Sequence, residues 1–224
     1  MKKYPAKQFT TLLAASLFII IFVYFITNEH KQNQKNTTPV QNVSIPDNFK
    51  ITLSTATIDT RKQDININDI LKSEPAAINL FIVQFDGPIL EQWKSNVSKY
   101  GYIIGYVPNN GLIVRTQTKN INVIKNIQHI QWLGYFQPNY KYYKNLLNSK
   151  DPEQKIVLTI LTTPQGNIKE IITGIEKVGG KTTGNYIKNG GNLEIEIANG
   201  KIPDIAEIKD VTWIEAYIEP QLLN

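Results

Sequence analysis

The feature that most constrains the fold is a segment that occurs twice, about eighty residues apart. The first copy runs from His129 to Asn139 and the second from Asp210 to Gln221. Each copy places a Trp before alternating apolar residues and a Pro. A period of this length is too long for a solenoid repeat and suits a duplicated small domain. We therefore expect two copies of one fold, each closed by its Trp-containing strand.

The first unit, residues 78–147, is predicted to follow the order βαββαβ. A helix is expected after Asp86, which can cap it, and Thr118 is expected to cap the second helix. Residues 109–111 read Asn-Asn-Gly, which favours a hairpin turn. The strands are expected at 79–86, 102–108, 112–115 and 130–136.

The second unit, residues 153–220, repeats this order. Its third strand alternates strictly, which directs Glu194 and Glu196 away from the core. Both units match the split βαβ pattern of ferredoxin-like domains, in which two helices cover one face of a four-stranded antiparallel sheet. The expected fold class is α+β, with two tandem ferredoxin-like domains. The other face of each sheet must be polar or covered by a partner.

The N-terminal segment, residues 1–27, carries a membrane signal. An apolar run from Phe9 to Ile26 follows three lysines and approaches the ~20 residues that span a bilayer. No small-x-small cleavage site follows Ile26, so an uncleaved signal-anchor, a transmembrane helix, is favoured over a cleaved signal peptide. We expect a single-pass protein of the cell membrane with its C-terminal domains extracytoplasmic, and secretion after cleavage is the alternative.

Residues 28–77 are rich in Asn, Gln, Lys, Thr and Asp, a composition typical of a flexible polar linker. Within this range, residues 51–58 alternate between apolar and polar side chains, which indicates a short strand as another interpretation.

The residues that carry chemistry are sparse. The chain has no Cys, which excludes disulfides, thiolate catalysis and Cys-based metal sites. His30 and His129 have no companion at metal-ligand spacing, and no nucleophile elbow or phosphate-binding loop is present. The net charge is +5, but many of the lysines lie in the leader and linker and the remainder are scattered without forming a stripe, so nucleic-acid binding is not expected. We expect a non-enzymatic protein with no catalytic, cofactor-binding or metal-binding residues.

Two segments of the first unit resemble the N-terminal region of certain bacterial secreted subtilisin-like serine proteases. They are 81–115, which contains VQFDGP and then Trp93, and 132–141, which reads WLGYFQPNYK. Residues 211–215, VTWIE, are similar to the strand that closes the second ferredoxin-like unit of that region. The resemblance spans about residues 78–220. In that family the region precedes the catalytic domain and is similar to an inhibitory, folding-assisting propeptide.

The resemblance implies protease binding rather than protease activity, because the sequence to Asn224 contains no catalytic Asp, His and Ser blocks. The expected function is to bind, inhibit or assist the folding of a subtilisin-like serine protease in trans. The alternatives are a structural or adhesion module of the cell envelope, and the propeptide half of a truncated or split protease. Such a propeptide packs its open sheet face on the enzyme and lays its C-terminal tail in the substrate cleft. Here the tail would be Tyr217 to Asn224, of which residues 221–224 follow the second unit. The residues expected to contact the protease are Glu194, Glu196, Tyr217, Glu219, Gln221, Leu222, Leu223 and Asn224.

Overall fold

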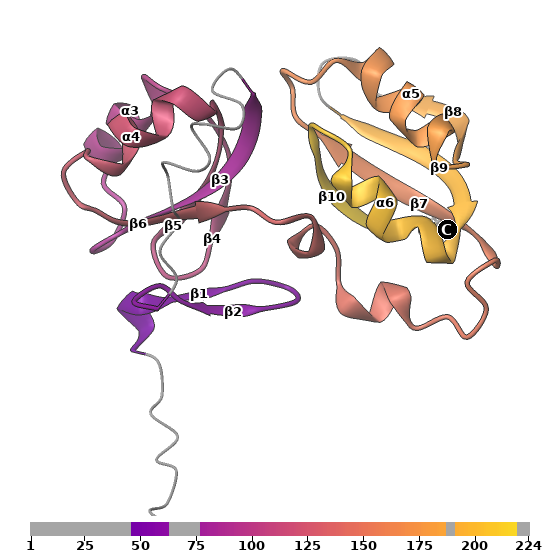
Figure 1. Cartoon of the computed structure of the whole chain (residues 1–224), viewed down its shortest axis with the longest axis horizontal. Coiled ribbons are helices and arrows are strands. Elements are labelled where there is room, and N and C mark those ends of the chain that lie inside the picture. The colour runs from indigo at the N-terminus through magenta and orange to yellow at the C-terminus, as the bar shows by residue number, and fades with distance from the viewer. Residues whose placement is uncertain (1–45, 63–76, 187–190, 219–224) are drawn as a thin grey trace, which may run out of the picture. The chain divides into compact units, whose positions relative to one another are not determined.

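A computed structural model describes residues 46–62, 77–186 and 191–218 of the chain (Figure 1). These residues belong to one compact unit, Ile45–Asn224, which mixes helices with several antiparallel sheets. It contains a first lobe (residues 77–136), a connection (137–154) and a second lobe (155–218). The expected helix at 1–27 lies outside the described residues. Within the described part, no helix has the length and apolar character needed to cross a membrane.

The sheet of the first lobe has the strand order β4-β5-β3-β6, with all neighbours antiparallel. The tight turn between β4 and β5 holds Asn109 and Asn110 at φ of 66° and 65°, as expected for this turn sequence. The elements are β3 (Ile78–Phe85), α3 (Glu91–Ser98), β4 (Tyr102–Val107), β5 (Gly111–Gln117), η2 (Thr118–Asn120), α4 (Ile121–Lys125) and β6 (Ile130–Tyr135).

The central strand β3 is buried on both faces. Phe81, Val83 and Phe85 pack against the helices in one core cluster. Leu80 and Ile82 point to the opposite face, where they belong to a second cluster. Two clusters on one strand mean that something other than the helices covers the second face.

A short hairpin provides that cover. The hairpin consists of β1 (Lys50–Thr52) and β2 (Thr57–Asp59), and the 3₁₀ turn η1 (Asp47–Phe49) precedes it. Ile51 and Ile58 are 0% and 2% exposed and share the cluster of Leu80 and Ile82. The hairpin lies inside the range 28–77 that the composition assigned to a solvated linker, and it follows the strand interpretation of residues 51–58.

A buried amide fastens the hairpin to the sheet. Gln84 of β3 is fully buried, and its Nε2 donates to the carbonyl oxygens of Lys50 (3.3 Å) and Asn109 (3.0 Å). Its Oε1 accepts a hydrogen bond of 2.9 Å from the hydroxyl of Thr60. The amide therefore joins the end of β2, the start of β1 and the β4–β5 turn.

The sheet of the second lobe has the order β10-β7-β9-β8, again antiparallel throughout. Leu193, Ile195 and Ile197 alternate into the core, as expected, and Ile171 and Ile175 of α5 cover them. The elements are β7 (Lys155–Thr162), α5 (Ile168–Lys177), β8 (Lys181–Tyr186), β9 (Asn192–Ala198), η5 (Asn199–Lys201), α6 (Ile202–Glu207) and β10 (Val211–Ala216). Residues 187–190, between β8 and β9, lie outside the described residues.

The helix caps of the first lobe differ from the expectation. Helix α3 begins at Glu91 after Leu90, several residues beyond Asp86. Thr118 lies inside η2, and its hydroxyl donates to the carbonyl of Ala77 at 3.1 Å, so it does not cap a helix. Both predicted caps were wrong because short polar side chains found tertiary partners that the local sequence does not show.

The connection contains η3 (Pro138–Tyr140) and η4 (Lys144–Leu147). It adds to the outer edge of β10, because the amide of Ile214 donates to the carbonyl of Lys141 at 2.7 Å and Tyr142 bridges Ile214 in parallel. Ser54 at the hairpin tip donates to the carbonyls of Tyr140 (3.2 Å) and Tyr142 (2.9 Å). Hairpin, connection and second sheet are thus continuous through hydrogen bonds.

Candidate functional site

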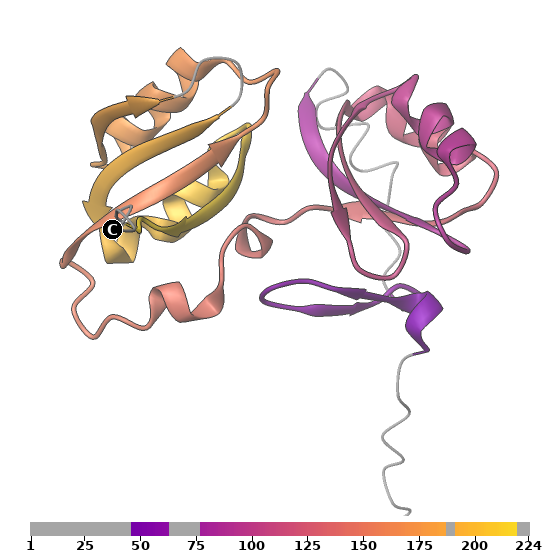
Figure 2. The same cartoon turned by 180° about the vertical axis from the view of Figure 1, so that it is seen from behind.

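The helix-free face of the second sheet is the main candidate surface (Figure 2). Strand register places Val157, Thr159 and Leu161 of β7 on this face, because Leu158 and Ile160 point into the core. Val157 is 38% exposed, and Thr159 and Leu161 are half-buried. Within the described ranges no hairpin covers this face as β1 and β2 cover the first sheet.

The predicted acidic residues lie on this face. Glu194 is half-buried and Glu196 is exposed, and their register partners on β7 are Thr159 and Val157. Glu215 of β10 also stands opposite Thr159, so carboxylates flank the central strand from both sides. The arrangement places the partly exposed Val157 beside negative charge, which suits a protein surface with basic groups or helix N-termini.

The predicted tail is described only at its beginning. Tyr217 is half-buried, and its amide donates to the carbonyl of Val157 at 3.0 Å, which continues the β10–β7 pairing past Ala216. Glu219, Gln221, Leu222, Leu223 and Asn224 lie outside the described residues, so their expected contact with a partner stays a prediction.

A hollow of about 420 Å³, here called the aromatic groove, lies beside this face. Each unit was expected to be closed by its Trp-containing strand; Trp132 of β6 is buried, at 7% exposure, whereas Trp213 of β10 is not. Trp213 is half-exposed and meets the exposed Tyr143 at a ring distance of 5.0 Å and an angle of 88°. The Tyr-rich run at 139–143 was the available sequence signal for this groove. Its principal lining residues are Leu53, Phe136, Tyr140, Tyr143, Leu161 and Trp213.

His129, the one histidine in the described part, has a structural role. Its backbone is left-handed, with φ of 72°, and its ring stacks on Trp93 at 4.0 Å. Its Nδ1 lies 3.2 Å from Oδ2 of Asp86, and its carbonyl accepts from the Asp86 amide. This His–Asp pair has the geometry of a base with its orienting acid, but the side chains that meet the ring, Asp86 and Trp93, are not activated nucleophiles. It serves to close the turn that follows β3.

A buried ion pair joins the two lobes. Arg115 of β5 donates through Nε and Nη2 to the two carboxylate oxygens of Asp210, at 2.5 and 2.9 Å. Their side chains are only 12% and 7% exposed. Burial alone raises the pKa of Asp210, but the hydrogen bonds and charge of Arg115 and a hydrogen bond from Thr163 outweigh it and lower that pKa below its usual 3.8.

A second buried cation, Lys141, lines a hollow of about 390 Å³ with Glu207 and Asp210. Its Nζ donates to the carbonyl of Ala206 at 2.6 Å, at the end of α6. Burial lowers the pKa of its ammonium to about 8, although the carboxylates of Glu207 and Asp210 act in the opposite sense. This amine is therefore partly neutral at mildly alkaline pH.

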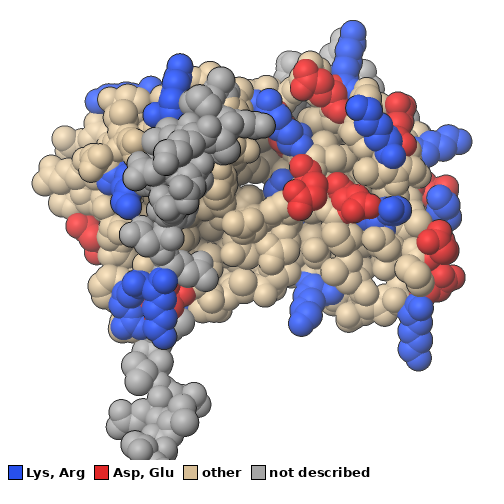
Figure 3. Space-filling model, in the orientation of Figure 1, with Lys and Arg blue, Asp and Glu red and all other residues tan. Residues whose placement is uncertain are grey.

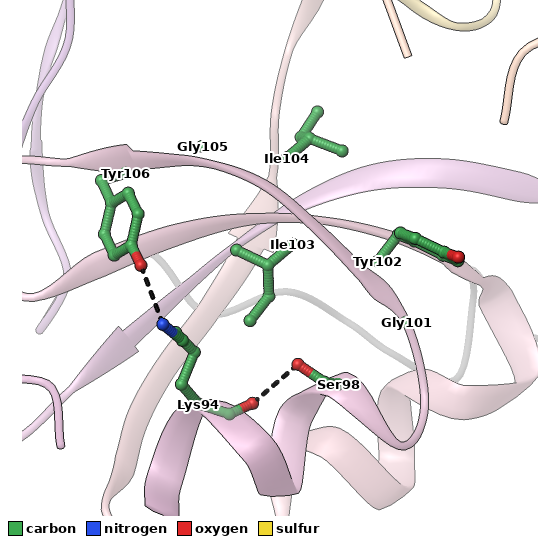
Figure 4. A pocket seen from close by; sticks show the side chains of 8 residues that line it. All are labelled: Lys94, Ser98, Gly101, Tyr102, Ile103, Ile104, Gly105 and Tyr106. Atoms are coloured by element: carbon green, nitrogen blue, oxygen red, sulfur yellow. Dashed lines mark hydrogen bonds between the residues drawn. The ribbon is translucent and has the colours of Figure 1, made fainter. Parts of the chain in front are cut away.

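Another hollow, of about 650 Å³, runs along β4 beside α3 (Figure 4). Lys94 forms its rim and binds the hydroxyl of Tyr106 at 3.3 Å and Glu91 at 2.7 Å, while Ile103 projects between strand and helix. Its described lining residues include no His, Asp or Glu. Among the described residues no group of His, Asp or Glu could hold a metal ion. On the face shown in Figure 3, Lys and Arg side chains are dispersed rather than gathered in one patch.

Comparisons with known proteins give one match. A family model described as a domain of unknown function (DUF8729) matches residues 35–137, a range that includes the hairpin and the entire first lobe. No curated protein and no solved structure matches this chain. The family match thus begins upstream of the hairpin and ends before the second lobe.

Proposed function

We propose that this chain is a non-catalytic binding protein whose second lobe contacts a subtilisin-like serine protease through its helix-free sheet face, and inhibits the enzyme or assists its folding. The observation that carries the proposal is the contrast between the two sheets. The first has its open face covered by Ile51 and Ile58, whereas the second presents Val157 and Thr159 of β7 beside the glutamates of β9 and β10. Partly exposed apolar side chains with charged neighbours are typical of a protein-binding surface.

The strand orders support a finer description of the fold. Both sheets follow one order, in which the first and third strands of each unit are central and antiparallel neighbours, and two helices connect the strands. We propose on this basis that both lobes are ferredoxin-like, and that residues 1–27 anchor them outside the cytoplasm. The surface would bind a protease much as propeptides do, with Glu194 and Glu196 meeting positive charge on the enzyme.

The test is inhibition of subtilisin-like proteases by the purified full chain in mild detergent. A Glu194→Lys/Glu196→Lys double variant should weaken inhibition strongly, since it replaces attraction by repulsion. Lys119→Glu/Lys125→Glu, in and near α4 of the first lobe, is the matched control and should inhibit like the wild type. The proposed partner would be wrong if the chain at micromolar concentration neither inhibits any subtilisin-like protease of the same cell nor assists its refolding.

A further inference from the structure

We propose that the aromatic groove binds a proline-rich, extended segment of another protein, one that carries a Lys or Arg beside its prolines. This site is separate from the glutamates of β9 on which the proposed protease contact rests. Its volume, about 420 Å³, lies in the range of sites that hold a small ligand or a few residues of peptide.

Hydrogen bonds within the chain hold the walls of the groove in place. The hairpin tip is hydrogen-bonded to the connection through Ser54, and Thr55 donates to the carbonyl of Asn139 at 2.6 Å. The connection is held to β10 by the bond from Ile214 to Lys141. Because these segments are already ordered, binding would cost less conformational entropy than it would in a mobile loop.

The groove presents aromatic rings to solvent. Tyr143 is 57% exposed and packs edge to face on Trp213, and Tyr106 in the same lining is 63% exposed. Phe136 is buried beneath Tyr140 and forms part of the floor. Pyrrolidine rings pack well on aromatic faces, and aromatic-lined grooves are the general means by which proteins bind polyproline II segments.

Other peptide conformations fit the site less well. An added β-strand needs a regular edge, but β10 has a register shift between Val211 and Trp213 and its edge is already bridged by Tyr142. An α-helix uses its carbonyls in internal hydrogen bonds and offers none of them to the indole N–H of Trp213. A polyproline II segment needs no strand ladder and has a preformed, low-entropy backbone.

The negative charge of Glu215 beside the groove favours a Lys or Arg next to the prolines of the ligand. The exposed carboxylate of Glu215 accepts a hydrogen bond of 3.2 Å from Nε1 of Trp213. A Lys or Arg of the ligand that pairs with Glu215 would move this carboxylate away from the indole nitrogen of Trp213. The indole N–H would then be free to donate to a ligand carbonyl, and polyproline II carbonyls have no internal partner.

The experiment titrates the full chain with synthetic peptides, by calorimetry and by tryptophan fluorescence. Three acetylated peptides of equal length are compared: prolines with two lysines, prolines with two glutamates, and alternating Gly and Ala with two lysines. We expect measurable binding only of the first peptide. Tyr143→Ala should raise the dissociation constant of the first peptide by about tenfold or more, because it removes one aromatic wall of the groove. Glu215→Gln should raise the same dissociation constant about two- to fivefold, as expected for the loss of an exposed ion pair.

The matched control is Tyr100→Ala, which removes a partly exposed tyrosine away from the groove and should leave the dissociation constant unchanged. Circular dichroism checks that each variant folds, and Glu215→Gln tests the site even if Tyr143→Ala does not fold. The proposal is overturned if none of the peptides binds at millimolar concentration, if the Gly-Ala peptide binds as well as the proline peptide, or if Tyr100→Ala and Tyr143→Ala have equal effects. If Tyr143→Ala loses peptide binding but inhibits proteases like the wild type, the groove and the protease-binding face are independent sites.

Discussion

Arg115 and Lys141 are two cations that the fold removes from water, and they are stabilised differently. Arg115 meets both oxygens of one carboxylate, a bidentate geometry that suits its planar guanidinium. Lys141 has the carbonyl of Ala206 as its close acceptor, and its neighbouring carboxylates act only through charge. Burial therefore makes the amine of Lys141 partly neutral at moderate alkalinity.

Lys141 should make stability rise with pH on the alkaline side. Its pKa is about 8 in the folded chain and near its ordinary 10.5 in the unfolded chain. Between these values the unfolded state binds more protons, so the free energy of unfolding increases as pH rises through this window. Urea unfolding at pH 7, 8, 9 and 10 should show this rise in the wild type and a smaller one in Lys141→Met. Lys144→Met, at an exposed site nearby, should behave like the wild type; an unchanged slope in Lys141→Met would contradict the assignment.

Asp210 should make the free energy of unfolding fall at acidic pH. Its pKa is lowered in the folded chain, so its contribution to stability is present above pH 3.8 and is lost as pH falls through the folded value. Asp210→Asn keeps a residue that tolerates the φ of 67° at this position. Urea unfolding at pH 7 and pH 3 should show a smaller loss on acidification in this variant than in the wild type. Asp204→Asn, on the exposed side of α6, is the control and should retain the wild-type loss.

At the scale of elements, the four outer strands share an irregularity that the inner strands lack. The pairs β4–β5, β8–β9, β3–β6 and β10–β7 each contain a register shift, whereas β3–β5 and β7–β9 run without one. Bulged edges are poor templates for pairing with another chain. The lobes therefore discourage edge-to-edge association and leave their faces and grooves as the surfaces available for binding.

The hairpin should be essential to the first lobe even though it is short. Ile51→Ala removes a fully buried side chain from the layer over Leu80 and Ile82 and should lower the free energy of unfolding by about 2–4 kcal/mol. Thr57→Ala, at an exposed position of the same hairpin, should cost less than about 0.5 kcal/mol. Urea unfolding measures both. Equal effects would mean that the hairpin does not form part of the core.

Periodic patterns predicted the larger elements, and tertiary contacts decided the rest. The alternation of Leu193, Ile195 and Ile197 and the Asn109-Asn110 turn both occur as expected, because each is a local property of the chain. Strands of only three residues within a polar stretch leave a weak pattern, so the linker composition concealed the hairpin. The helix caps were wrong for a similar reason. The Arg115–Asp210 pair spans 95 residues and has no local signature at all.

At the scale of the whole chain, the two sheets share a strand order but not an environment. The first has layers on both faces, and the second has helices on one face and solvent-exposed residues on the other. The buried ion pair and the bonds from the connection to Ile214 link them. Cooperative unfolding of both lobes in one transition is the expected consequence, since neither keeps all its contacts without the other.

Arg115→Ala should break this coupling. It leaves Asp210 buried without its partner, which should cost about 3–5 kcal/mol. Calorimetry should show one transition in the wild type and two resolved transitions in the variant. Lys201→Ala, which removes an exposed ion pair with Asp204, should change stability by less than about 1 kcal/mol and keep a single transition. One undivided transition in Arg115→Ala would show that the connection alone couples the lobes.

The covering hairpin also dictates how the molecule can be divided for use. A fragment cut just before β3 would keep every strand of the first sheet yet expose Leu80 and Ile82 to water, and such a patch invites self-association. Aggregation of that fragment in the test tube would then be mistaken for a property of the protein. A boundary upstream of Asp47 avoids this, and it makes the first lobe a candidate for independent production, labelling and grafting onto other proteins.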